Sequence, residues 1–139
     1  MSGELSAQDL AVVPLHSSED VVRLRQAVRE HAVALKFSLV DQTKIVTAAS
    51  ELARNTLIYG KGGDAHLCLL LNGTRKGLHM RFVDQGPGIV DVEQALKDGF
   101  TSGTGLGLGL GGAKRLSDDF DITTGPAGTS VSITKWKQY

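Results

Sequence analysis

The segment 103–112 constrains this chain most, because six of its ten residues are glycine and most of the others are leucine. Each glycine inside a helix costs about 0.8–1 kcal/mol relative to alanine, so this segment is a poor ordinary helix. A flexible linker would favour serine and other polar residues over alternating leucine. We therefore interpret the segment as a loop leading into a helix, with bare backbone N–H groups open to phosphates and leucines packed inward.

Two common phosphate-binding motifs fit this segment poorly. No Gly-Lys-Ser/Thr sequence follows it, which excludes a Walker A loop. The register that begins at Gly107 matches the dinucleotide fingerprint formally. However, no predicted strand leads into it and no βαβ unit surrounds it.

Two polar residues stand out on a predicted helix from Asp41 to about Tyr59. Glu51 and Asn55 are four residues apart, so they share one face at the border of the apolar stripe. The simpler interpretation is a solvated polar edge. The functional interpretation is an Asn55 oxygen that binds Mg²⁺, one turn from a Glu51 carboxylate that can accept a proton.

A third candidate is Asp84-Gln85-Gly86-Pro87-Gly88, directly after a predicted strand. Aspartate, glycine and proline all favour turns, so a plain turn leaving the strand is the simpler interpretation. The alternative is that Asp84 presents a lone acceptor to a ligand while Gly86 and Gly88 let the backbone pass close by.

The remaining pattern predicts an α+β domain. The expected order is strand 10–15, helices 17–35 and 41–59, strands 66–71 and 78–83, a short helix 91–97, a helix that begins within 99–112, and strands 120–124 and 129–136. The strands at 66–71 and 78–83 read as a hairpin with a six-residue connection. We expect a flexible tail over 1–9, a single domain over 10–139, and helices on one face of a mixed, mostly antiparallel sheet.

Composition narrows the function classes. The formal net charge is zero, which argues against nucleic-acid and membrane-surface partners. Cys68 is the single cysteine and lies in an apolar run, so we expect a buried, inert thiol. The N-terminus lacks a signal peptide's apolar core, and no run approaches the ~18 apolar residues of a membrane span. We therefore expect a cytoplasmic protein.

The order and spacing of these motifs resemble the GHKL ATPase/kinase superfamily. The matching segments are Glu51-x-x-x-Asn55 (its N box), Asp84-x-Gly86-x-Gly88 and Gly103–Gly109 (its two glycine boxes) and Gly128-Thr129-x-Val131 (its late Gly-Thr strand). The sequences around Asn55 and Gly105 are most similar to the stress-response switch kinases of that superfamily. The resemblance covers nearly the whole chain and implies a Bergerat-type two-layer sandwich.

The resemblance also implies roles for individual residues. Asn55 would coordinate the Mg²⁺ that bridges the ATP phosphates, Glu51 would be the general base, and Asp84 would accept the adenine amino group. Gly88 would let the adenine ring approach, and Thr129 would support its edge. The remaining nucleotide-binding candidates are Gly86, Gly103, Thr104, Gly105, Leu106, Gly107 and Gly109. A lid over roughly 97–104 would cover the phosphates.

In function, the resemblance implies an ATP-dependent serine/threonine kinase of the stressosome. Such kinases phosphorylate small STAS-domain scaffold proteins and, once released, activate a PP2C-type phosphatase. An anti-sigma factor of the same fold, sequestering a transcription factor under nucleotide control, is the alternative.

The chain departs from sensor histidine kinases of that superfamily. The residues before Asn55 leave no room for a histidine-bearing helical hairpin, and Ile58 stands where a basic residue is common. Lys97, Lys114 and Arg115 are the candidates for balancing the γ-phosphate charge.

Overall fold

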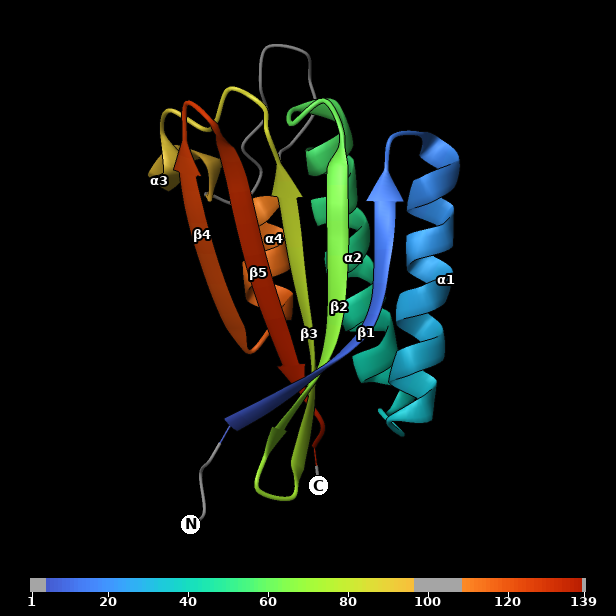
Figure 1. Cartoon of the computed structure of the whole chain (residues 1–139). Helices are drawn as coiled ribbons and strands as arrows, with labels where there is room; N and C mark the ends of the chain where they lie inside the picture. The colour runs from blue at the N-terminus through green and yellow to red at the C-terminus, as the bar shows by residue number, and fades with distance from the viewer. Residues whose placement is uncertain (1–4, 97–108, 139) are drawn as a thin grey trace.

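The computed structural model describes residues 5–96 and 109–138, and these form one open sheet with helices on one of its faces (Figure 1). The strands run in the order β1-β2-β3-β5-β4. Their bounds are β1 Leu5–Leu15, β2 Gly63–Asn72, β3 Arg75–Asp84, β4 Asp119–Gly125 and β5 Gly128–Trp136. The helices are α1 Ser18–Ala34, α2 Leu39–Ile58, α3 Val92–Ala95 and α4 Leu110–Leu116. The predicted two-layer α+β class is confirmed.

The sheet is more regular than predicted. All four strand pairings among the described residues are antiparallel, so the sheet is not mixed. The hairpin between β2 and β3 is closed by Gly73 and Thr74 alone, with Asn72 opposite Arg75, so the predicted six-residue connection is wrong. Gly73 has φ +66°, a left-handed conformation that glycine adopts without a Cβ clash.

Strand β1 begins at Leu5, inside the segment 1–9 that we expected to be a flexible tail. Its first residues are exposed on both faces, so they show none of the apolar alternation that marks a half-buried strand. Pairing with β2 fixes this part of the chain, from Leu5 opposite Asn72 onward.

Serine caps set where the two long helices begin. The Ser17 hydroxyl accepts from the Asp20 backbone N–H at 3.3 Å, as its position in the sequence predicts. The Ser38 hydroxyl accepts from the Asp41 N–H at 3.1 Å, so α2 begins at Leu39 rather than at Asp41.

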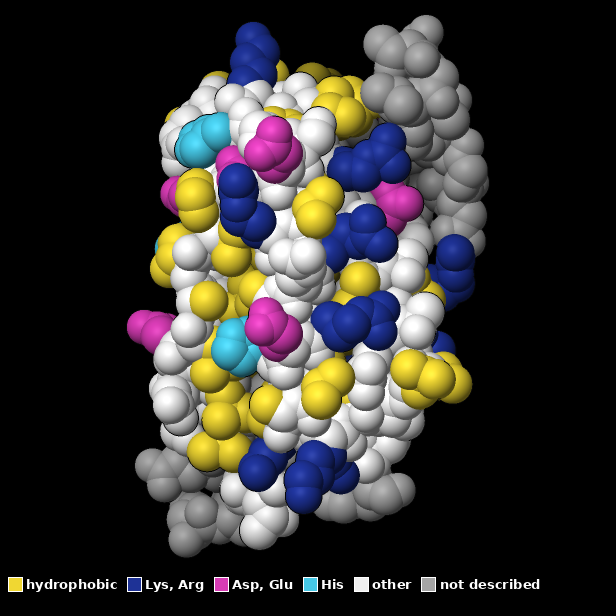
Figure 2. Space-filling model, turned by 90° about the vertical axis from the view of Figure 1, so that its right-hand side faces the viewer, with side chains coloured by type: hydrophobic (Ala, Val, Ile, Leu, Met, Phe, Trp, Pro, Cys, Tyr) yellow, Lys and Arg dark blue, Asp and Glu magenta, His cyan; other side chains and the backbone are white. Residues whose placement is uncertain are grey.

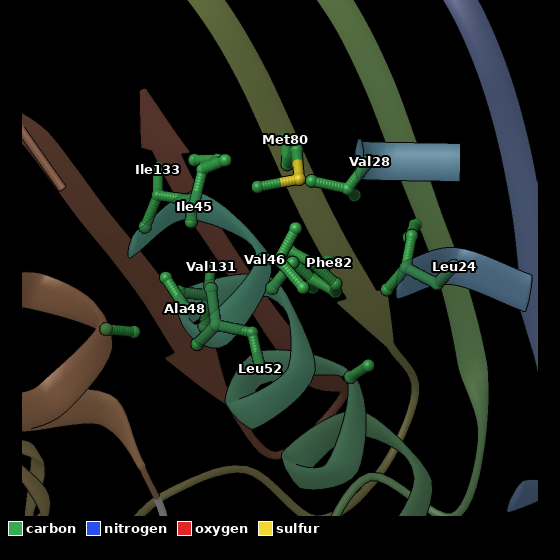
Figure 3. Packing of buried hydrophobic residues seen from close by; sticks show 14 of the residues in the cluster. Leu24, Val28, Ile45, Val46, Ala48, Leu52, Met80, Phe82, Val131 and Ile133 are labelled. Carbon is green, nitrogen blue, oxygen red and sulfur yellow. The ribbon is translucent and has the colours of Figure 1, made fainter. Parts of the chain in front are cut away.

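The core lies between the helices and one face of the sheet (Figure 3). Side chains of α2 point toward the central strands, and α1 adds Leu24 and Val28 at the side. The labelled α2 and strand side chains, all buried, are Ile45, Val46, Ala48, Leu52, Met80, Phe82, Val131 and Ile133. Fully burying one such large aliphatic or aromatic side chain contributes roughly 1.5–3 kcal/mol, so α2 is held firmly against the sheet.

A buried lysine on β5 connects the start of α2 to the sheet. Lys135 on β5 is 7% exposed, and its Nζ lies 3.8 Å from an Asp41 carboxylate oxygen and 3.5 Å from one of Asp118. These contacts link the first turn of α2 to β5 and to the residue that precedes β4. Within the described ranges, no helix is long and apolar enough to cross a membrane.

Candidate nucleotide site

Helix α2 carries the first two predicted site residues on its C-terminal half. Asn55 is 6% exposed, and its Oδ1 atom is buried without a hydrogen-bond partner among residues 5–96 and 109–138. A buried acceptor left unpaired costs about 1–3 kcal/mol, so such atoms in folded proteins usually serve a purpose. The structure therefore rules out the simpler interpretation of Asn55 as part of a solvated polar edge.

The unpaired Asn55 oxygen fits the proposed role in Mg²⁺ binding. Mg²⁺ prefers oxygen ligands and is commonly held by one or two protein groups together with substrate phosphates. In the part of the chain that the structure describes, no group of three or more His, Cys, Asp or Glu side chains is placed to hold a metal ion. The donor chemistry thus suits an ion that arrives with a nucleotide.

Glu51 lies one turn before Asn55 and is half-buried beneath Gly109. A Cβ on Gly109 would sit 2.8 Å from Glu51 Cβ and 2.9 Å from its Oε2. Gly109 also has φ +75° and stands immediately before α4, so two independent constraints exclude other residues there. Gly109, the last residue of the second glycine box, therefore starts α4 directly against Glu51, the predicted base.

Asp84 ends β3 with a buried carboxylate whose two oxygens have different surroundings. Oδ1 accepts hydrogen bonds from the backbone N–H groups of Gly86, at 2.9 Å, and Thr129, at 3.3 Å. Oδ2 receives no hydrogen bond from the described residues and faces Gly60, whose added Cβ would lie 2.4 Å away. One oxygen thus holds the carboxylate in place, and the other is left to accept from a ligand.

Glycines make room around this carboxylate. An added Cβ on Gly60 would lie 2.3 Å from Asp84 Cγ, and one on Gly128 would lie 2.1 Å from the Asp84 carbonyl oxygen. A Cβ on Gly86 would lie 2.9 Å from the Gly60 Cα. Only glycine fits these close backbone approaches. In the sequence, Gly60 directly follows the helix predicted to end at about Tyr59, and no local pattern points to Asp84 as its neighbour.

A hydroxyl pair joins the Asp84–Gly88 loop to the last two strands. The Ile89 backbone N–H donates to Thr124 Oγ1 at 2.9 Å, and Thr124 Oγ1 lies 2.8 Å from Thr129 Oγ1. Gly88, at φ +86°, passes so close to β4 that an added Cβ would lie 2.2 Å from the Gly125 carbonyl oxygen. Sequence reasoning missed Thr124, because a lone threonine in a strand carries no signal of such a contact.

One cavity collects four of the twelve predicted catalytic and nucleotide-binding residues, namely Asn55, Asp84, Gly88 and Thr129. Its lining consists of Asn55, Tyr59, Gly60, Asp84, Gly88, Ile89 and Thr129. These residues come from α2 and the turn after it, from the end of β3 and the loop after it, and from the start of β5, which are far apart in sequence. Glu51 lies one turn along α2 from this cavity.

Other predicted residues lie outside the described ranges or away from the cavity. Gly103, Thr104, Gly105, Leu106, Gly107 and the lid over 97–104, with Lys97, fall outside the described residues. Lys114 and Arg115 are exposed on α4, so their predicted contact with a γ-phosphate stays a prediction.

Gly60→Ala should weaken adenine-nucleotide binding by more than tenfold while the protein still folds. The new methyl group overlaps the Asp84 carboxylate, which must turn away from the cavity, and such overpacking costs about 1–3 kcal/mol. Gly73→Ala is the control, because Gly73 lies in the β2–β3 turn at the other end of the sheet and an added Cβ meets no atom within 4 Å beyond its chain neighbours. Calorimetric titration with ATP measures both variants, and equal affinities would contradict the tight fit of Gly60 against Asp84.

A family comparison now agrees with this geometry. A model of the histidine kinase-like ATPase domain matches residues 16–135. The chain belongs to this family. The predicted GHKL assignment is therefore confirmed.

Curated relatives refine the assignment. The serine/threonine-protein kinase RsbT of Bacillus subtilis is 40% identical over 129 residues, covering 92% of this chain and 97% of RsbT. The anti-sigma F factor of the same organism is 28% identical over 117 residues, covering 80% of each chain. The predicted enzyme class, a protein serine/threonine kinase, is confirmed by the first match, which spans RsbT nearly from end to end.

Solved structures support the fold. A Mycobacterium tuberculosis protein with RsbU and RsbW domains aligns with a TM-score of 0.64 at 18% identity, over 96% of this chain and 33% of that one. SiaB–SiaC from Pseudomonas aeruginosa gives a TM-score of 0.54 at 12% identity, over 92% and 90% of the two chains. At these identities the likeness concerns the fold alone.

Proposed function

We propose that this chain is a cytoplasmic, Mg²⁺-dependent serine/threonine kinase that phosphorylates a STAS-domain partner in a partner-switching stress pathway. The observation that carries the proposal is the buried, unpaired Asn55 oxygen in one cavity with the Asp84 carboxylate, one turn from Glu51. The relationship to RsbT, at 40% identity, favours phosphotransfer over simple nucleotide binding.

Different cavity residues contact different parts of the bound Mg²⁺-ATP. Asp84 Oδ2 accepts from the adenine amino group, because its other oxygen is already occupied by backbone donors. Thr129 supports the adenine edge through its hydroxyl, which Thr124 holds in place. Asn55 supplies an oxygen for Mg²⁺, an ion that neutralises phosphate charge when bound.

Glu51 performs the proton transfer. As the partner's hydroxyl oxygen forms its bond to the γ-phosphorus, its proton passes to the Glu51 carboxylate. The bond from the γ-phosphorus to the β–γ bridging oxygen breaks at the same time, and ADP carries away that electron pair. General-base assistance of this kind contributes typically 10²–10⁴-fold in rate.

The second candidate is an anti-sigma factor that sequesters a transcription factor under nucleotide control. Relatives of that name are 27–28% identical to this chain. An anti-sigma factor and a kinase share the nucleotide site, so the product of the reaction must distinguish them. We further propose that the kinase, once released from its substrate, activates a PP2C-type phosphatase.

The phosphorylated product should be acid-stable and should sit on the partner protein. The four histidines lie within the ATPase domain itself: His16 follows β1, His31 is in the last turn of α1, and His66 and His79 are on β2 and β3. His79 is also engaged by Thr134 Oγ1 at 2.8 Å. Incubation with γ-labelled ATP and STAS-domain proteins encoded beside this gene should label the partner with a phosphomonoester. Acid-labile label on the enzyme itself would contradict the serine/threonine assignment, and absence of label with intact ATP binding would favour the anti-sigma alternative.

A further inference from the structure

The end of the sheet opposite the nucleotide cavity carries a second pocket. Strand β3 runs from Arg75 at this end to Asp84 at the other, a span of about 30 Å for a strand of its length. In Figure 1 the β2–β3 turn and the end of the chain lie together here, away from the Asp84 end of β3. The lining includes Lys36, Arg75, Lys76 and Lys137, and none of the described lining residues is acidic.

This concentration of positive charge is local. The chain as a whole holds 15 basic and 15 acidic residues, for a formal net charge of zero. None of the four lining cations forms an ion pair with a carboxylate among the described residues, whereas Arg23 and Lys135 elsewhere do. Figure 2 shows Lys and Arg side chains along the whole height of the face seen there, some of them at its lower end.

The Arg75 guanidinium lies on the other face of the sheet from Lys76 and Lys137, because it stacks on Trp136, whereas these two lysines alternate onto the face of Leu78 and Lys135. The guanidinium carbon lies 5.2 Å from the centre of the Trp136 ring, a cation–π arrangement. Trp136 is fixed in turn by its Nε1–H donating to Asp119 at 2.9 Å and by Gly77 against its ring. Arg75 Nε is nevertheless buried without a hydrogen-bond partner in the described chain. This donor is closed off from solvent, so Arg75 adds positive charge at this end of the sheet and is not itself a contact for the ligand.

The backbone places the three lysines of the pocket on the helix side of this end of the sheet. The Lys137 N–H donates to the Lys76 carbonyl at 2.8 Å, which extends the β3–β5 ladder and sets these two residues side by side. Lys36 has φ +63°, at a helix end where glycine is usual. Three residues later, α2 opens with Leu39 and Val40, which are 72% and 63% exposed.

We propose that this pocket docks an acidic segment of a partner protein, with carboxylates on Lys36, Lys76 and Lys137 and apolar side chains toward Leu39 and Val40. Charge complementarity favours this occupant, because the cations come from three separate chain segments and no described carboxylate neutralises them. Exposed apolar residues next to Lys36 in the chain favour a polypeptide over a small inorganic anion. A partner segment bound in this pocket does not cover the nucleotide cavity, which lies at the other end of β3.

Fluorescence anisotropy with a short fluorescein-labelled oligoglutamate peptide tests this site on the full chain. We expect saturable binding that weakens with added salt, and an oligolysine peptide should not bind. Lys36→Glu with Lys137→Glu should lower the affinity by about tenfold, since two attractions become repulsions. The matched control is Arg25→Glu with Lys44→Glu, an equal charge change on exposed positions of α1 and α2 outside the pocket lining.

The outcomes separate the alternatives. Both double variants should bind ATP like the parent, which shows that they are folded. Equal loss of peptide binding in both would mean a general charge effect and would overturn the site. Absence of oligoglutamate binding would also overturn the site. The same holds if inorganic pyrophosphate binds the pocket and the peptide does not.

Discussion

Asp84→Asn is expected to reduce adenine-nucleotide affinity by more than tenfold without unfolding the protein. The asparagine oxygen can keep the two backbone hydrogen bonds that Asp84 Oδ1 accepts from Gly86 and Thr129. Its NH₂ group would then stand where Oδ2 stands, facing the adenine amino group with a second donor. Losing a hydrogen bond to a charged acceptor costs about 1.5–3 kcal/mol, and tenfold in affinity corresponds to about 1.4 kcal/mol.

Calorimetric titration with ATP measures this change, and thermal unfolding checks the fold. Asp121→Asn is a matched control, because Asp121 is exposed on β4 and makes no contact with the cavity. Unchanged ATP affinity in a folded Asp84→Asn protein would remove Asp84 from adenine recognition.

Residues whose role depends on local spacing could be predicted from the sequence. Glu51 and Asn55 share a helical face because they are four residues apart, and the structure places them so on α2. Asp84 could be placed at a strand end because glycine and proline follow an apolar run. Both inferences need only the period of a helix or strand.

Features that depend on remote contacts could not be predicted. Gly60 and Asp84 meet because β2 pairs with β3, and nothing in the sequence around Gly60 reports that contact. Thr124 on β4 reaches Ile89 because β5 pairs with both β3 and β4, and these pairings are equally remote in sequence. Strand β3 begins at the charged residues Arg75 and Lys76, so hydrophobicity alone places its start too late.

Glu51→Gln is expected to separate ATP binding from phosphotransfer. Glutamine has nearly the same shape, so it should pack against Gly109 as glutamate does. It cannot take a proton from the partner's hydroxyl, so phosphotransfer should fall by about 10²–10⁴-fold. ATP affinity should stay near the parent value, because the Asn55 and Asp84 side chains remain in the cavity.

Two other variants are compared with Glu51→Gln to separate a loss of chemistry from a loss of binding. Asn55→Ala should instead weaken Mg²⁺-dependent ATP binding, because it removes the buried oxygen that fits the ion. Glu30→Gln makes the same chemical change on the exposed side of α1 and should alter neither property. Rates are measured by single-turnover labelling of the STAS-domain partner at saturating ATP, so that weaker nucleotide binding cannot pass for slower chemistry. If Glu51→Gln transfers phosphate at the parent rate, Glu51 serves only to seat Gly109 at the start of α4, and another group takes the proton.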